Sequence, residues 1–206
     1  MTRTLLVFSI LLTLAVCSRN LSVVDTDEYH FLKIRYPGAD FTEMLAINNV
    51  GQAVGRFKRS SFVDEWVLFI YDIDSTQYTP IEIEDARTGY IPRTSNTLWG
   101  IDFNDAGQII LNDIDVYLID IESKEAHEIK SNTNSRNLRV NSVNNAGKVA
   151  GNYRDNYGPP RGFLYDIESE TFSYANYPGA ENTEFIGIND FGQVVAQSIM
   201  PNDTSK

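Results

Sequence analysis

Carboxylates are the side chains whose number and spacing could support a reaction in this chain. Asp25, Asp72, Asp120 and Asp166 each end a short apolar run, and two carboxylates at a suitable separation would serve as acid and base in glycoside hydrolysis. The same aspartate recurs, however, at the same place in every repeat. A residue that each repeat needs favours a local role, in which the carboxylate caps a turn, over one reaction at a single site.

Other catalytic groups are scarce. His30 and His127 are the two histidines, they lie in different repeats, and no serine nucleophile stands at a recognisable spacing from a histidine and an acid. Cys17 is the one cysteine, so the mature chain has no thiolate metal site. The glycine-containing turns join two strands, unlike a phosphate-binding loop. We therefore predict no catalytic residues, no metal site and no cofactor.

Arginines and aromatic residues in the longer connections between strands are the best candidates for ligand binding. The predicted ligand-binding residues are Arg59, Trp66, Arg154, Tyr157 and Arg161. Variable connections on a rigid scaffold are where binding residues usually lie. Acidic and basic residues are balanced in these connections, whereas the turns that begin at the repeated aspartates are strongly acidic. The alternative interpretation is a plain solvated surface.

Four nearly identical turns must position these residues. Each has Asn, then Asn or Asp, one free residue and Gly, at 48–51, 104–107, 144–147 and 189–192. Asn at the first corner can accept a hydrogen bond from the backbone further along, and Gly supplies the positive φ of a bulged hairpin. Short apolar runs without proline flank each turn. The pattern predicts four antiparallel hairpins.

The hairpins belong to a longer repeat. The turn glycines are 56, 40 and 45 residues apart, and an apolar run ending in Asp follows each of the first three turns, at 69–72, 117–120 and 163–166. With a fourth strand after that run, each unit is a four-stranded meander of roughly 40 to 45 residues, which is typical of one propeller blade.

The two ends of the chain complement each other. Residues 22–55 align without a gap on residues 163–196, and 13 of the 34 pairs are identical. The mature chain therefore begins with the third and fourth strands of a unit and finishes with the first and second. Because three whole units lie between them, we predict an all-β, four-bladed β-propeller closed by pairing of the N-terminal and C-terminal strands, which would remove exposed sheet edges.

Residues 1–18 have the pattern of a secretory signal peptide. Arg3 precedes an apolar run from Leu5 to Val16, and small residues stand before a cleavage site after Cys17. Residues 14–17 also approximate a lipobox, so a lipid anchor at Cys17 is the alternative. We expect a secreted, periplasmic or cell-surface protein, with a single propeller domain over 19–200, a disordered tail over 201–206 and no membrane insertion after cleavage.

Net charge narrows the range of partners. The chain carries 17 bases and 28 acids, for a net charge of −11, and loss of Arg3 leaves 16 bases and a net charge of −12. This excess of acid disfavours nucleic acid and anionic membranes as partners. We expect a monomer.

The segments Gly187–Ala196, Arg161–Asp166 and Tyr177–Ala180 resemble the bacterial HAF-repeat proteins, whose repeat is named after a His-Ala-Phe tripeptide before the third strand. The resemblance covers nearly all of residues 22–197. The tripeptide itself is absent, with Arg161-Gly162-Phe163 in its place. The resemblance implies export and a propeller-like repeat, but no activity.

The sequence thus favours an exported, non-enzymatic propeller that binds a glycan, a peptide or a protein through its connections. An exported carbohydrate-active hydrolase is the alternative from another class, and a purely structural surface repeat is a third. An enzyme would gather two or more carboxylates in one pocket, whereas a binding module would present arginines and aromatics without them.

Overall fold

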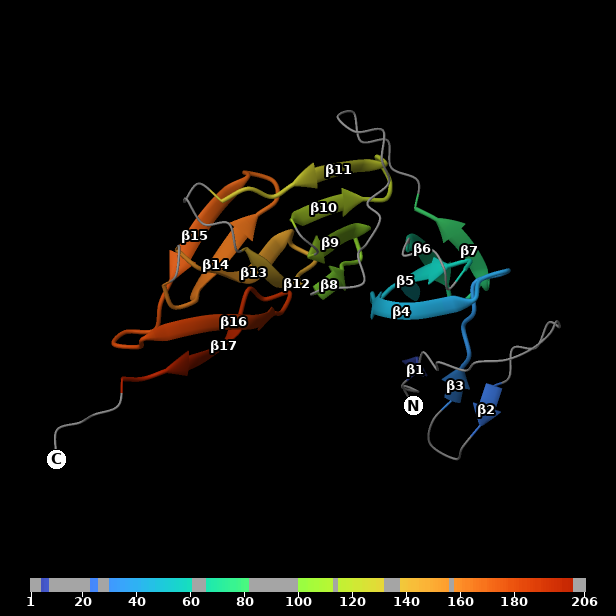
Figure 1. Ribbon diagram of the computed structural model, residues 1–206, viewed down its shortest axis with the longest axis horizontal. Coiled ribbons are helices and arrows are strands. Elements are labelled where there is room, and N and C mark those ends of the chain that lie inside the picture. The colour runs from blue at the N-terminus through green and yellow to red at the C-terminus, as the bar shows by residue number, and fades with distance from the viewer. Residues whose placement is uncertain are drawn as a thin grey trace.

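The computed structural model describes residues 5–7, 23–25, 30–60, 66–81, 100–112, 115–131, 138–155 and 158–201, with side chains from Phe31 onward. Regular structure in these residues consists of β-strands, which form an arc of separate sheets (Figure 1). The described residues contain no helix of the length and hydrophobicity needed to cross a membrane. The predicted all-β class is confirmed.

Three four-stranded antiparallel meanders make up the body of the arc. Sheet 1 contains β4 (Phe41–Ile47), β5 (Gln52–Lys58), β6 (Val67–Asp72) and β7 (Gln77–Pro80). Sheet 2 contains β8 (Gly100–Phe103), β9 (Gln108–Asn112), β10 (Val116–Asp120) and β11 (Glu125–Glu128). Sheet 3 contains β12 (Arg139–Val143), β13 (Lys148–Tyr153), β14 (Arg161–Asp166) and β15 (Thr171–Ala175). These are the three complete repeats that the sequence predicts.

The remaining strands lie at the two ends of the arc. β16 (Asn182–Ile188) and β17 (Val194–Ile199) form a two-stranded sheet beside sheet 3. β2 (Val23–Asp25) and β3 (His30–Leu32) pair antiparallel near sheet 1, and β1 (Leu5–Val7) pairs with β3 in parallel. Both predicted half-repeats therefore exist as hairpins.

The described strands do not form the pairing that would close a four-bladed ring. β2 and β3 share a sheet with β1 instead of β17, and the two hairpins lie far apart in Figure 1. Repetition in the sequence identifies which hairpins are halves of one unit. This repetition does not predict the angle between neighbouring sheets, because that angle results from side-chain packing between the sheets. The angle decides whether the two ends of the chain meet.

Apolar clusters between neighbouring sheets hold the arc together. One, between sheets 1 and 2, includes Leu68, Ile109 and Ile119, and another, between sheets 2 and 3, includes Ile110 and Phe163. Burying such a side chain contributes about 1.5–3 kcal/mol. The relative orientation of the three complete sheets is therefore fixed by buried packing.

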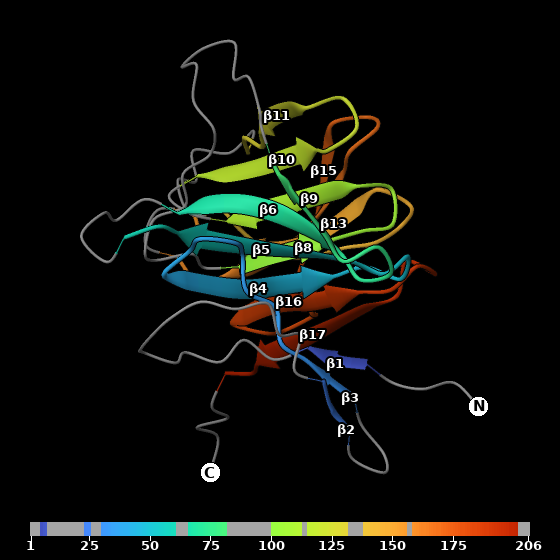
Figure 2. The same ribbon diagram turned by 90° about the vertical axis from the view of Figure 1, so that its right-hand side faces the viewer.

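The strands run across the arc, so their connections separate into two sides (Figure 2). The short turns β4–β5 and β6–β7, with their equivalents in the other sheets, lie on the right of that view. We call this side the turn rim. The end of β5 and the start of β6 lie on the left, as do their equivalents in the other sheets, and we call this side the crossing rim.

Candidate ligand-binding rim

A ladder of asparagine side chains links the four predicted hairpins on the turn rim. The Oδ1 atoms of Asn104 and Asn144 accept hydrogen bonds from the backbone N–H four residues on, at 2.9 and 2.8 Å. Their Nδ2 groups donate to the backbone carbonyl of the next turn, from Asn104 to Asn144 at 3.0 Å and from Asn144 to Asn189 at 2.9 Å. Asn48 makes the same two bonds, to Gln52 and Asn104. The turn glycines all have positive φ, as predicted.

The next residue of each turn extends the ladder with alternating amides and carboxylates. The order is Asn49, Asp105, Asn145, Asp190. The Asn145 Nδ2 group donates to Asp105 at 2.8 Å and to Asp190 at 3.0 Å, and the Asn49 Nδ2 group donates to Asp105 at 3.1 Å. These polar groups bond to one another, so their role in the described structure is to join the sheets.

The repeated aspartates cap turns. Asp72, Asp120 and Asp166 accept hydrogen bonds from the backbone N–H of the serine three residues on, at 2.8, 2.8 and 3.1 Å. The Ser75 hydroxyl also donates to Asp72 at 2.7 Å, and this bond, followed by that from the Ser75 N–H, lowers the pKa of Asp72. The capping interpretation is confirmed for these three residues. The side chain of Asp25 lies outside the described part of the chain.

The crossing rim of sheet 1 carries a packed cluster of cations and aromatic rings. Trp66 is 5% exposed, the Arg56 guanidinium lies 4.3 Å from the centroid of its ring, and the Lys58 Nζ lies 5.0 Å from it. Glu43 accepts a hydrogen bond of 2.7 Å from Arg56 Nε. Cations over indole rings are held by the ring quadrupole. Arg59 follows at the end of this cluster and is exposed.

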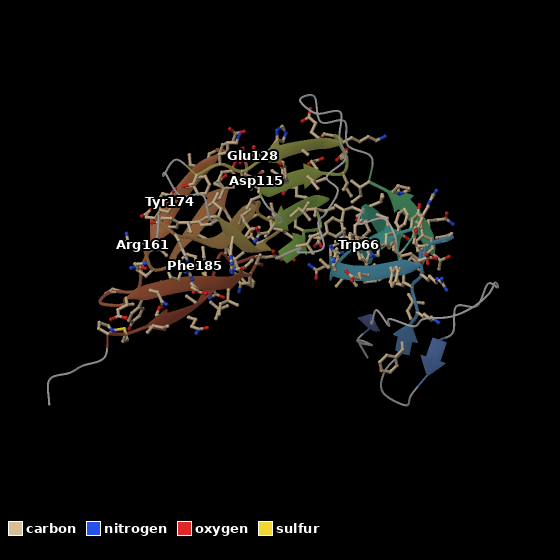
Figure 3. All side chains as sticks on the ribbon, viewed as in Figure 1. Trp66, Asp115, Glu128, Arg161, Tyr174 and Phe185 are labelled. Carbon is tan, nitrogen blue, oxygen red and sulfur yellow. The ribbon has the colours of Figure 1, made fainter. Side chains whose placement is uncertain are left out.

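Two of the other predicted ligand-binding residues, Arg154 and Arg161, lie beside or on sheet 3. Arg154 and Arg161 flank the connection from β13 to β14 and are both exposed, whereas Tyr157 lies outside the described residues. Figure 3 shows Trp66 and Arg161 on different parts of the arc, with sheet 2 between those parts. The structure thus separates the predicted residues into two groups. Within the described chain, no ion pair joins Arg59, Arg154 or Arg161 to an acid.

Sequence reasoning missed the residues that surround Trp66. Arg56 and Lys58 alternate along β5 and so lie on one face of it, where both reach the indole. The alternation of these two cations along the strand was the signal in the sequence that could have identified them. His127, in contrast, is exposed beside Glu125, with Nε2 3.4 Å from Oε2. No group of three histidine, cysteine, aspartate or glutamate side chains suited to a metal occurs among the described residues.

Solved structures with a similar fold include two TolB proteins and a lyase. TolB from Acinetobacter baumannii aligns with a TM-score of 0.51 at 13% identity over 77% of this chain and 41% of that one. A putative TolB from Agrobacterium tumefaciens gives 0.51 at 12% identity over 83% and 61%, and an oligogalacturonate lyase in complex with manganese gives 0.52 at 12% over 78% and 53%. The fold is of the β-propeller type.

These similarities are limited to the fold. The chain spans between 41% and 61% of the lengths of the three structures. No protein-family model matches the chain, and neither does any curated protein. The resemblance to HAF-repeat proteins therefore stays a prediction.

Proposed function

We propose that the protein is an exported β-propeller binding module that recognises a glycan, peptide or protein through its crossing rim. The observation that carries the proposal is the contrast between the rims. Polar side chains on the turn rim bond to one another, whereas Arg59, Arg154 and Arg161 on the crossing rim are exposed and have no acidic partner in the described chain.

Exposed guanidinium groups favour ligands that carry carboxylates. Arg presents a planar fork of donors that matches a carboxylate with two parallel hydrogen bonds. Trp66 is too buried to stack on a ligand, so its proposed role is to hold Arg56 and Lys58 beneath the exposed surface. Uronic-acid glycans and acidic peptide segments are therefore the preferred ligands.

Export follows from the apolar leader over residues 5–16, with either signal cleavage or a lipid anchor at Cys17. We further propose that the β2–β3 and β16–β17 hairpins are two halves of one fourth blade. This arrangement would cover the open edges of both hairpins, and unprotected edges favour uncontrolled association.

The test of ligand binding is a triple substitution, R59A/R154A/R161A, measured on the chain without residues 1–18. Binding to immobilised polygalacturonate, neutral dextran and a poly-glutamate peptide is compared by biolayer interferometry. We expect the native chain to bind at least one acidic probe and the triple variant to lose at least about tenfold in affinity, since each charge-assisted bond contributes about 1.5–3 kcal/mol.

The matched control is K124E/K148A, which changes the net charge by the same amount through two cations of the turn rim. Circular dichroism checks that both variants are folded. Equal loss in both variants would show a nonspecific charge effect and reject the crossing rim as the site. Release of reducing ends from a glycan would instead support the carbohydrate-active hydrolase.

A further inference from the structure

β17 presents an apolar surface that its counterparts in the other sheets bury. Val195 is 59% exposed, while the equivalent Val54, Ile110 and Ala150 are all 0% exposed. In sheet 3 the equivalent strand β13 pairs with β12 on one side and β14 on the other, but β17 pairs with β16 alone. One edge of β17 therefore lacks the strands that complete its blade, and one face lacks the neighbouring sheet against which Val54 and Ile110 pack.

The β2–β3 hairpin has the geometry of the missing strands. It pairs Val23 with Leu32, Val24 with Phe31 and Asp25 with His30. With the alignment offset of 141 residues, this register equals that of β14–β15, where Leu164 pairs with Ser173, Tyr165 with Phe172 and Asp166 with Thr171. β2 lies at the edge of its sheet, and that free edge corresponds to the edge by which β14 pairs with β13.

The crossings that follow the two hairpins are also equivalent. In the first, Ala39 N–H donates to the Tyr36 carbonyl at 3.1 Å, and Tyr36 N–H donates to Thr42 Oγ1 at 3.0 Å. In the second, Ala180 N–H donates to the Tyr177 carbonyl at 3.0 Å, and Tyr177 N–H donates to Thr183 Oγ1 at 2.8 Å. β2–β3 is thus connected to sheet 1 as β14–β15 is connected to β16, which makes it the outer half of a neighbouring blade.

Side-chain sizes at the junction are compatible. In sheet 3, Gly151 faces Phe163, and a Cβ at Gly151 would lie 2.6 Å from the phenyl ring and 2.3 Å from the Arg139 carbonyl. β17 has Ala196 at this position, and the residue equivalent to Phe163 is Ser22. The ring that would collide with an alanine is therefore replaced by a small side chain.

We propose that the β17 edge binds the β2–β3 hairpin of a second copy of this chain. The inference rests on the proposed fourth blade and specifies where its outer half comes from. Closure within one chain would require the buried interfaces between sheets 1, 2 and 3 to change angle, because β17 and β2 are far apart in the arc (Figure 1). A second copy binds without changing these interfaces, in line with the small backbone movements of most associations.

A two-fold axis completes the assembly. Each chain supplies one β17 edge and one β2 edge, so two chains form two identical junctions and leave neither edge open, as closed cyclic symmetry requires. Three complete blades from each chain and two shared blades make eight, within the range of known propellers. The asparagine ladder would also continue, because Asp190 of one chain would meet Asn49 of the partner chain and preserve the alternation of amide and carboxylate.

The experiment measures mass by sedimentation equilibrium on the chain without residues 1–18. We expect two chains per particle. V195K should lower the association constant at least about 100-fold, because both junctions would bury an unpaired charge. S173K is the matched control, since it adds the same charge at an exposed position of β15, the outer strand of sheet 3, away from both edges of the junction. S173K should leave the mass unchanged.

A cysteine pair identifies the source of the hairpin. The β13–β14 register pairs Ala150 with Leu164, so the junction should pair Val195 with Val23. Oxidised V23C/V195C should run on a non-reducing gel as two linked chains. A disulfide within a single chain would reject the proposal that a second copy supplies the hairpin, but it would support the proposed fourth blade. No disulfide, with no effect of V195K on mass, would overturn both, and ligand binding by the crossing rim is measured separately.

Discussion

Thr76, Lys124 and Glu170 have positive φ, of 57°, 60° and 54°, at the same position of the three acidic turns. At positive φ, a residue other than glycine destabilises the folded state by roughly 1–2 kcal/mol relative to glycine. Glycine offsets part of this advantage, because it loses more conformational entropy on folding. We therefore expect Lys124→Gly to stabilise the protein by about 0.5–1 kcal/mol in urea unfolding. Glu122→Gly, two residues earlier at negative φ, should not stabilise it, and equal effects would contradict this explanation.

Asp72 predicts a pH dependence of stability. Donation by the Ser75 hydroxyl and N–H lowers the pKa of Asp72 below its ordinary value of 3.8. The folded state therefore binds the proton less tightly than the unfolded state. The stabilisation that ionised Asp72 contributes is complete above pH 3.8 and is lost as the pH falls through the lowered pKa. The difference in unfolding midpoint between the native protein and Asp72→Asn should shrink over that acidic interval. A difference that grows with acidity would contradict it.

Trp66 shows where residue-level prediction from sequence ends. A tryptophan beside a long connection, near several arginines, has the composition of a binding site. The structure buries its ring under Arg56 and Lys58. The sequence shows the residue types, but the burial of Trp66 depends on where β5 places Arg56 and Lys58. No local pattern around Trp66 predicts this burial.

Among the elements, the asparagine turns allow a direct comparison of one residue in two settings. Asn144 is 3% exposed and donates to Asn189 in the next turn, whereas Asn189 is exposed and donates to Gln193 in its own. We expect Asn144→Ala to destabilise the protein by about 2–4 kcal/mol, because it leaves buried backbone groups unsatisfied. Asn189→Ala should lower the free energy of unfolding by about 1 kcal/mol, and thermal unfolding measures both changes. Equal costs would mean that the ladder between sheets contributes nothing.

The turns were also the most predictable elements. Asn, Gly and the capping aspartates act within four residues of chain, so the same letters give the same hydrogen bonds in each copy. The Tyr-Pro-Gly-Ala crossings repeat their bonds for the same reason. The capping role of Asp72, Asp120 and Asp166 was predictable because a function needed once per turn recurs once per turn.

For the whole molecule, ring closure is the part of the prediction that the described strands do not confirm. Alignment of residues 22–55 with residues 163–196 identifies two half-blades, and both occur as antiparallel hairpins. Whether they meet depends on the angles accumulated over interfaces such as that of Ile110, Val149 and Phe163. These angles arise from packing between residues distant in sequence, and a small difference at each interface moves the ends of the arc by a large distance.

The proposed two-chain ring should depend on salt in a defined direction. Each mature chain has 16 bases and 28 acids, so two chains repel each other at long range, while the contacts at the junction, Val195 and its neighbours, are largely apolar. The Debye length is about 10 Å at 0.1 M salt and about 3 Å at 1 M, so added salt screens the repulsion and strengthens association of apolar surfaces. Sedimentation at increasing sodium chloride should give a rising association constant for the native chain. V195K should stay largely monomeric throughout, because its defect is a charge buried at short range, which salt screens poorly. An association constant that falls with salt would show that attraction between opposite charges, and not the β17 edge, joins the chains.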